Sequence, residues 1–245
     1  MGLGGGLPAG GDVTAPVQLA LVDVVPPLVP GADLRLCSVD ALIADESLHG
    51  QAALIMADPP WVYTQDPGET SAADHYDCLP IDAIARSLAS SAALARPGCR
   101  LGVWSTWPLD EEWMRAVFAC SEWPWRYLTG GSWIKLGGSP GIGYHWRGES
   151  EPIRIYAADG PTGRPRTTLA SAHIERGPHS QKPIPWLIAM IEAWTDPGDL
   201  VIDLYAGLAP LADACVITGR RYVGAELDPK RHRAALGLIA SGVRR

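Results

Sequence analysis

The sequence lacks the cysteine pattern of a protein held together by metal or by disulfides. Five cysteines are scattered through 245 residues, and no two of them form a C-x-x-C pair. This spacing argues against a zinc site and against a disulfide framework, and it suits a reducing cytoplasm. We therefore expect a cytoplasmic protein with no metal centre.

Long apolar runs are also lacking. The apolar stretch 13–29 is interrupted by Asp23 and by several prolines, and the N-terminus carries no basic segment. The sequence therefore predicts no signal peptide, no membrane span and no membrane partner. A hydrophobic content of 47% and a mean hydropathy of +0.04 fit a soluble globular protein. The length suits one large α/β domain with a sizeable core.

Basic charge is scarce for a protein that acts on nucleic acid. Lys and Arg number 20 against 27 Asp and Glu, which gives a net charge of −7. Since phosphate neutralisation supplies most non-specific affinity, this balance counts against a nucleic-acid substrate. A local basic patch can coexist with a negative total. Arginines in the second half could form a phosphate-binding strip or could equally be solvated without function: Arg147, Arg154, Arg164, Arg166 and Arg176.

A phosphate-binding loop of the P-loop type is absent, because no glycine-rich loop is followed by Lys-Ser or Lys-Thr. The glycines at 2–6 follow no strand and precede no helix, so they do not form a dinucleotide-binding loop. We expect residues 1–16 to be a disordered glycine-rich tail and residues 17–245 to form a single domain.

Short apolar runs alternate with segments of helical spacing along the rest of the chain. Strands are expected at 34–39, 52–57, 99–106, 132–136, 152–157, 200–204 and 222–226. Helices are expected at 41–49, 81–95, 109–120, 184–194, 208–218 and 229–240. This alternation predicts an α/β fold with a mostly parallel sheet and helices on both faces.

The tetrapeptide Asp58-Pro59-Pro60-Trp61 directly follows the buried strand 52–57. Neither proline can donate a backbone N–H, so the strand must end there in a rigid turn. Open α/β sheets place their ligands at the carboxyl ends of strands. A simple strand-ending turn would explain Asp-Pro alone. The adjacent aromatic residue and a second half-site favour a functional role.

The second half-site begins where the strand 200–204 runs into the small turn Ala206-Gly207. Such a turn lets the backbone approach a ligand closely, and the helix that follows offers free N–H groups. About twenty residues on, Glu226 ends the next strand, where a carboxylate can accept hydrogen bonds from both ribose hydroxyls. The alternative is an ordinary βαβ unit with a solvated Glu226.

The ordered motifs Asp58-Pro59-Pro60-Trp61, Asp203-Leu204-Tyr205-Ala206-Gly207 and Gly224-Ala225-Glu226 resemble those of S-adenosylmethionine-dependent amino-methyltransferases. The catalytic motif comes first, as in the β-type order. Tryptophan in the tetrapeptide resembles the MT-A (70-kDa-subunit-like) N6-adenine methyltransferases more narrowly. Three further stretches are similar to that family: Trp133-Ile134-Lys135, Gly143-Tyr144-His145-Trp146-Arg147-Gly148 before Glu151, and His179-Ser180-Gln181-Lys182-Pro183.

The resemblance covers about residues 34–240 and implies a Rossmann-like methyltransferase fold. It implies a catalytic half at about 34–160 and a cofactor half at about 178–240. The catalytic residues would be Asp58, Pro59, Pro60 and Trp61. Asp58 and Pro59 would hold the adenine amine, and Trp61 would stack on the base.

The same resemblance implies S-adenosyl-L-methionine as the cofactor. Asp40 would contact its adenine, Glu226 its ribose, and Lys182 with His179 its methionine carboxylate. Asp203, Tyr205 and Gly207 would shape the cofactor turn, and Tyr63, Lys135 and Arg147 would bind substrate. Other readings are a helix N-cap for Asp40 and a solvated surface position for Lys182.

One departure from the family pattern concerns the cofactor turn. The family usually carries a second glycine and small hydroxyl residues, where this chain has Gly207-Leu208-Ala209-Pro210. The intact tetrapeptide nonetheless favours activity. The sequence therefore predicts an N6-adenine methyltransferase acting on nucleic acid, DNA rather than RNA. The alternatives are a cytosine-N4 methyltransferase, whose tetrapeptide usually opens with Ser, and a non-catalytic nucleic-acid-binding or partner subunit. The oligomeric state is open, a dimer being one option.

Overall fold

A single eight-stranded sheet organises the computed structural model, which describes residues 1, 30–62, 78–136, 150–159, 173–175 and 181–242. The strand order is β1-β8-β7-β2-β3-β5-β4-β6. β5 runs antiparallel to both of its neighbours, and the other neighbouring strands are parallel. The strands are β1 (Ala32–Leu36), β2 (Ala52–Ala57), β3 (Ala95–Trp104), β4 (Arg126–Leu136), β5 (Ser150–Ala157), β6 (His173–Glu175), β7 (Leu200–Asp203) and β8 (Arg221–Glu226).

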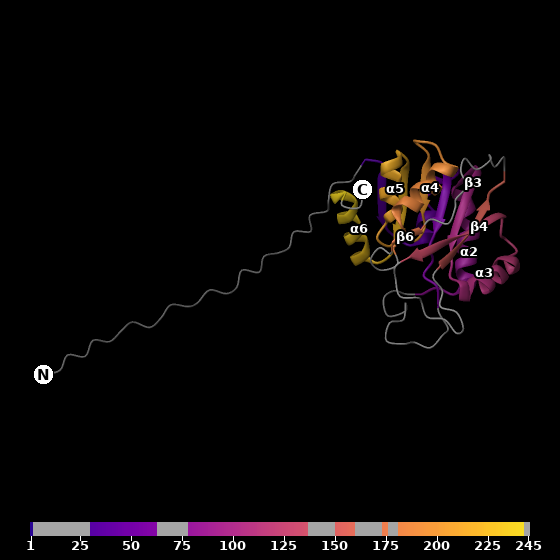
Figure 1. Ribbon diagram of the computed structural model, residues 1–245, viewed down its shortest axis with the longest axis horizontal. Helices are drawn as coiled ribbons and strands as arrows, with labels where there is room; N and C mark the ends of the chain where they lie inside the picture. The colour runs from indigo at the N-terminus through magenta and orange to yellow at the C-terminus, as the bar shows by residue number, and fades with distance from the viewer. Residues whose placement is uncertain (2–29, 63–77, 137–149, 160–172, 176–180, 243–245) are drawn as a thin grey trace.

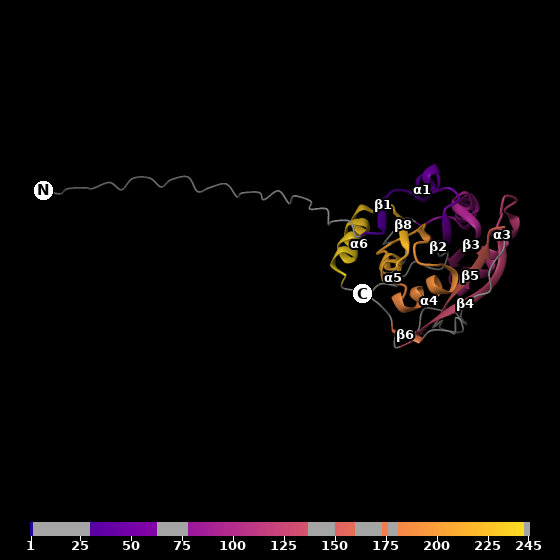
Figure 2. The same ribbon diagram turned by 90° about the horizontal axis from the view of Figure 1, so that it is seen from above.

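Helices cover both faces of this sheet, as the sequence predicted (Figure 1, Figure 2). One face packs against α1 (Val39–Ile43), α2 (Ile81–Ser90) and α3 (Trp107–Ala119). The other packs against α4 (Ile184–Trp194), α5 (Pro210–Thr218) and α6 (Pro229–Ser241). Figure 2 shows α1 on one side of the strands and α4 with α5 on the other. The architecture is the predicted Rossmann-like α/β fold.

The centre of the sheet explains why its strands read as unbroken apolar runs. Every residue of β2 and of β7 is buried. Alternate side chains enter opposite cores: Ile55 packs with the α2 side, whereas Leu54 packs with the α4 side. A strand covered on both faces has no solvent side, so it shows no polar alternation.

The boundary between α2 and β3 differs from the prediction. The helix expected at 81–95 ends at Ser90, a 3₁₀ turn (Ser91–Leu94) follows, and β3 already begins at Ala95. Pro97 and Gly98 were expected to separate a helix from a strand, but they lie within β3. The pairing of β2 with β3 shifts register there, and Gly98 has a φ of +78°. The irregular start of the strand accommodates both residues.

Three further differences concern a helix and two strands. The helix expected at 41–49 is split into α1 and a 3₁₀ turn (Glu46–Leu48), because the Asp45 side chain accepts the Ser47 N–H and starts a new turn. The short strand β6 was not expected, and β4 begins six residues earlier than predicted. Within the described residues, no helix is both long and apolar enough to cross a bilayer.

Candidate active site

Asp58 lies beside the turn that ends β7. β2 and β7 are parallel neighbours that pair Met56 with Asp203, and the Leu204 N–H donates to the Met56 carbonyl at 2.9 Å. Asp58 and the turn at Tyr205 and Ala206 therefore lie side by side, at the carboxyl ends of β2 and β7. The two half-sites, 145 residues apart from Asp58 to Asp203, are adjacent in the fold.

The turn after β7 is held by backbone bonds and by Glu226. The Ala206 N–H donates to the Ala225 carbonyl at 2.9 Å. The Glu226 carboxylate accepts the Gly207 N–H and the Asp228 N–H, each at 2.8 Å. Gly207 has a φ of +56°, and a Cβ added there would meet no atom within 4 Å. Glu226 thus fixes the turn, and open space remains where a side chain of residue 207 would project.

Ala209 stands where the family pattern has a second glycine, and it takes the left-handed conformation. Its φ is 53° and its ψ is 50°, and it is the one non-glycine residue of the described chain with a positive φ. Its side chain is fully buried. The departure noted in the sequence is therefore accommodated by backbone strain rather than by a different turn.

Asp203 is buried beneath this turn. The Tyr222 hydroxyl donates to its Oδ2 at 3.3 Å. Burial raises the pKa of the Asp203 carboxyl to about 7, the Tyr222 hydrogen bond opposes the rise, and the Asp58 charge adds to it.

A chain of four charged side chains connects Asp58 to the antiparallel part of the sheet. The Lys182 ammonium donates to Asp58 Oδ2 at 2.8 Å and to Glu151 Oε2 at 3.1 Å. The other oxygen of Glu151 accepts the Lys135 ammonium. Side-chain exposure is 43% at Asp58 but 10% at Lys182. The chain therefore runs from a solvent-accessible carboxylate into the protein.

Tryptophan rings surround the two ammonium groups. Lys182 Nζ lies 5.0 Å from the ring centroid of Trp104, and Lys135 Nζ lies 4.9 Å from that of Trp133. Trp186, in the first turn of α4, packs on Trp104 with 4.7 Å between centroids. This contact anchors the start of α4, and it sets the position of Lys182 just before the helix.

The electrostatics of these four side chains favour the charged form of Lys182. Burial alone would lower the pKa of the Lys182 ammonium, but the Asp58 and Glu151 carboxylates outweigh it and raise that pKa. Burial alone would raise the pKa of Glu151, but Lys182 and Lys135 lower it. Desolvation raises the pKa of the Asp58 carboxyl, and Lys182 opposes that rise. Because the Asp58 side chain is 43% exposed, water limits its shift.

The rest of the tetrapeptide is packed against the protein. The Pro59 carbonyl accepts the Trp61 N–H at 2.9 Å, and the Pro60 carbonyl accepts the Leu79 N–H at 2.8 Å. The Trp61 side chain is only 4% exposed and meets the Trp113 ring edge-on at 5.6 Å. A base could stack on Trp61 only if the indole left this packing, so its stacking role stays a prediction.

Asp40 lies next to the turn but is not a helix N-cap. The N-cap of α1 is Ser38, whose side chain accepts the Ala41 N–H. Asp40 is exposed, and its Oδ1 accepts the Ser87 hydroxyl at 3.2 Å. Burial raises the pKa of the Tyr205 hydroxyl to about 12, Ser87 opposes the rise and the Asp40 charge adds to it. The structure therefore brings Asp40 to Tyr205 and excludes the capping alternative.

Several predicted site residues have other surroundings or lie outside the description. Lys135 pairs with Glu151, and its predicted role in substrate binding stays a prediction. Arg154 is not a free cation of a basic strip, because its guanidinium pairs with Asp110 of α3. The predicted residues His179, Tyr63 and Arg147 lie outside the described residues.

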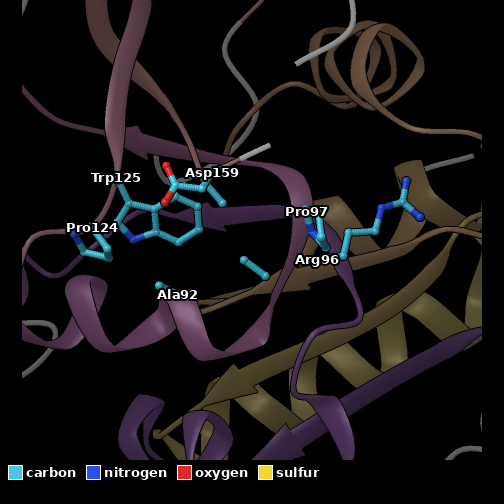
Figure 3. Close-up of a pocket in the computed structure, with 8 residues that line it drawn as sticks. Ala92, Arg96, Pro97, Pro124, Trp125 and Asp159 are labelled. Atoms are coloured by element: carbon cyan, nitrogen blue, oxygen red, sulfur yellow. The ribbon is translucent and has the colours of Figure 1, made fainter. Parts of the chain in front are cut away.

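Two hollows are found away from the four-charge chain. A cavity of about 260 Å³ beside Arg96, Pro97, Trp125 and Asp159 lies where β3 begins, at the opposite end of that strand from the candidate site (Figure 3). In that view Arg96 points away from Trp125, and its guanidinium pairs with Asp199. The second, of about 430 Å³, lies between Trp107 and Tyr127. Neither is lined by a residue of the tetrapeptide or of the cofactor turn.

Sequence reasoning missed the role of Glu151. In the sequence this residue stands out only because it follows a similar stretch, yet it joins both lysines of the site. The missing signal is the register of β4 and β5, which places Glu151 opposite Trp133. The one cue that the sequence offers is a glutamate directly before the predicted strand 152–157, since a charge that becomes buried there must be paired.

Comparisons of sequence match two parts of the chain to methylases. Residues 127–237 match the family model for DNA methylases of the N6/N4 type. YubD of Escherichia coli (strain K12), a methylase by name, is 37% identical over 62 residues. That match spans 25% of this chain and 27% of YubD.

Comparisons of structure extend over most of the chain. M1.HpyAVI in complex with SAM matches with a TM-score of 0.65 at 15% identity, over 85% of this chain and 99% of that one. TTHA0409 of Thermus thermophilus, a DNA modification methylase by name, was solved with S-adenosyl-L-methionine. It matches with a TM-score of 0.65 at 18% identity, over 86% and 94%. The cytosine-N4-specific PvuII DNA methyltransferase gives a TM-score of 0.67 at 11% identity, over 86% and 93%. The chain has the fold of the S-adenosylmethionine-dependent DNA methyltransferases, and residues 127–237 match their N6/N4 family.

Proposed function

We propose that this protein is an S-adenosylmethionine-dependent DNA methyltransferase that modifies an exocyclic base amine. One observation carries the proposal: Asp58 and the Gly207 turn follow the carboxyl ends of two neighbouring parallel strands, β2 and β7. The hydrogen bond from the Leu204 N–H to the Met56 carbonyl joins these two strand ends. Ligands of open α/β sheets bind at the carboxyl ends of the strands. The match of residues 127–237 to the DNA methylases supports the same function.

The residues at the turn fit the cofactor. Gly207 leaves open space where a side chain would project. Each Glu226 oxygen accepts one backbone N–H and, with two lone pairs, retains capacity for a ribose hydroxyl. Asp40 would face the adenine beside Tyr205. S-adenosyl-L-methionine supplies an electrophilic methyl group on a sulfonium, and two of the matched structures contain it.

Asp58 and Pro59 would prepare the base amine for attack. The nitrogen lone pair is delocalised into the ring, so the amine is a poor nucleophile. Hydrogen bonds from its N–H groups to Asp58 Oδ1 and to the Pro59 carbonyl would favour a pyramidal nitrogen with a free lone pair. Asp58 would also stabilise the positive charge that develops on nitrogen and hold the proton that nitrogen then sheds. Positioning of this kind can contribute roughly 7–11 kcal/mol.

We infer that the modified base is adenine, at N6. The tetrapeptide opens with Asp58, whereas cytosine-N4 enzymes usually open theirs with Ser. Its last residue, Trp61, is the residue that the MT-A family has at this position. The competing base is cytosine: the matched family covers both amines, and a cytosine-N4-specific enzyme shares the fold. Digestion of methylated DNA to nucleosides, followed by mass spectrometry, separates N6-methyladenine from N4-methylcytosine.

The test of the activity is transfer of a labelled methyl group from S-adenosyl-L-methionine to DNA, with RNA compared in parallel. Asp58→Ala should lose at least a hundredfold in rate. Asp82→Ala serves as the matched control, since that aspartate is exposed on α2 and pairs with Arg86 on the same helix. Equal transfer by Asp58→Ala and the unsubstituted protein would remove Asp58 from the mechanism.

A non-catalytic subunit with this fold is the second candidate. The strained Ala209 and the buried Trp61 ring favour it, because each departs from an open, preformed site. Calorimetry separates the two: heat on titration with S-adenosyl-L-methionine supports the enzyme. Absence of both heat and thermal stabilisation supports the subunit.

A further inference from the structure

The four-charge chain (Asp58, Lys182, Glu151 and Lys135) carries a large desolvation cost, because most of its charges are taken out of water. Its two carboxylates and two ammonium groups cancel in charge, and the three inner side chains are 10–15% exposed. Buried ion pairs can often be replaced by apolar side chains without loss of stability, because desolvation offsets their attraction. Stability therefore does not by itself explain the chain. Its end at Asp58 points to function.

The contacts within the chain fix one oxygen of Asp58 and leave the other available. Lys182 donates to Oδ2, and no bond within the described residues is assigned to Oδ1. Lys182 cannot easily rotate away, since Glu151 accepts its second N–H and the Trp104 ring faces its ammonium. Asp58 itself follows the end of β2 and is 43% exposed, so it has little packing of its own. Lys182 is the restraint on the carboxylate.

We propose that Lys182, held in place by Glu151, is a positioning residue that orients the Asp58 carboxylate toward the base amine. The inference rests on the proposed function, and it assigns Lys182 a task other than contact with the methionine carboxylate. Glu151 sets the direction of the ammonium, and Lys135 balances the charge of Glu151. A displacement of about 1 Å at such a site can cost on the order of a hundredfold in rate.

Opposite shifts in the titration of Asp58 distinguish this role from a merely structural one. Lys182→Met removes the cation that opposes protonation, so the pKa of Asp58 should rise. Glu151→Gln removes a like charge that raises that pKa, so it should fall. Both are read by carbon-13 NMR of aspartate carboxyl groups in the free protein, with Asp58→Asn identifying the resonance. This readout needs neither cofactor nor DNA.

Kinetics then test whether orientation matters. At saturating S-adenosyl-L-methionine and DNA, Lys182→Met should lower kcat about a hundredfold and Glu151→Gln about tenfold. Lys182→Arg should recover part of the loss. The Kd for S-adenosyl-L-methionine by calorimetry should change less than about threefold. Asp110→Asn is the matched control, because it weakens the part-buried ion pair with Arg154, which lies on β5 as Glu151 does. It should shift neither the Asp58 titration nor kcat.

Several outcomes would overturn the inference. A Lys182→Met protein with weakened cofactor binding and unchanged kcat would make Lys182 a cofactor ligand instead. Identical Asp58 titrations in Lys182→Met, Glu151→Gln and the unsubstituted protein would show that the chain does not act on Asp58. If Lys182→Met does not fold, Glu151→Gln decides. If the unsubstituted protein transfers no methyl group to DNA, the proposed function fails, whereas the titrations still test the Lys182–Asp58 coupling.

Discussion

Ala209 carries a β carbon in a backbone conformation that glycine adopts at lower cost. The left-handed region costs a residue of this kind roughly 1–2 kcal/mol. Ala209→Gly should therefore raise the free energy of unfolding by up to about 1 kcal/mol, since the added flexibility of the unfolded chain offsets part of the gain. Urea denaturation followed by circular dichroism measures it.

The matched substitution for this turn is Gly207→Ala. Gly207 is also left-handed, and open space surrounds its Cα, so an added methyl group meets only the backbone cost. Unfolding free energy should fall by about 1 kcal/mol. Equal destabilisation by Ala209→Gly and Gly207→Ala would show that buried methyl packing at Ala209, rather than backbone strain, dominates that position.

Asp203 makes stability depend on pH. Its pKa is about 7 in the folded protein against an ordinary value of 3.8. The stability that this group contributes is fully present below pH 3.8, and it is lost as the pH rises toward 7, because the unfolded chain ionises first. Asp203→Asn removes that ionisation. Its stability relative to the unsubstituted protein should therefore rise by about 2–3 kcal/mol between pH 5 and pH 8.

Denaturation with urea at pH 5 and at pH 8 measures the effect of Asp203→Asn. A stability difference that is the same at both pH values would place the folded-state pKa of Asp203 near its ordinary value. The cofactor affinity of the same variant tests its predicted place in the cofactor turn. Greater stability together with weaker binding is expected, since strained or desolvated groups at sites trade stability for function.

Arg220 ties two helices together at their carboxyl ends. Its guanidinium donates to the Thr195 carbonyl at the end of α4 at 2.7 Å and to the Thr218 carbonyl of α5 at 2.6 Å. It also donates to the Thr195 hydroxyl at 3.1 Å. A cation there complements the negative ends of both helix dipoles. These contacts hold α4 and α5 side by side against the β7 half of the sheet.

Arg220→Lys should lower the free energy of unfolding by about 2–4 kcal/mol, because an ammonium cannot reproduce the planar fork that serves three acceptors. Thermal and urea denaturation measure the loss. Arg115→Lys is the control: that arginine is 73% exposed in an i,i+4 pair with Glu111, and its replacement should matter by less than about 0.5 kcal/mol. Similar effects of the two substitutions would show that the Arg220 fork contributes no more than a surface pair.

Elements that are buried on both faces were the ones that the sequence predicted best. β2 and β7 were expected almost to the residue, because an unbroken apolar run has few other interpretations. The α2–β3 boundary was wrong, because Pro97 and Gly98 end helices locally but also fit a strand that begins irregularly. β6, with three residues, has too little sequence to carry a pattern.

The same contrast holds within the site. Asp58 and Glu226 were identifiable because each directly follows or ends a recognisable strand. The contact of Lys182 with Glu151 was not, because it depends on the antiparallel register of β4 and β5 and on the angle at which α4 leaves Pro183. Those are properties of tertiary packing. Local sequence does not determine them.

At the scale of the whole molecule, the sheet interleaves the two halves of the chain. β2, from the first half, lies between β3 and the later strand β7, while β1 pairs with β8 at the edge. The proposed catalytic and cofactor residues therefore lie on one sheet although they come from distant segments. Ligand binding at the β7–β8 side should stabilise the complete sheet and not just one half of it.

S-adenosyl-L-methionine at a hundredfold excess over its Kd should stabilise the folded protein by about 2.7 kcal/mol, which raises Tm by several degrees. Asp58→Ala should keep this shift, because the proposed partner of Asp58 is the base amine and not the cofactor. Glu226→Gln should lose most of it, because one of its two acceptor oxygens becomes a donor. Differential scanning fluorimetry, with each variant compared to its own ligand-free Tm, measures the shifts. Loss of the shift in Asp58→Ala and its retention in Glu226→Gln would invert the assignment of the two half-sites.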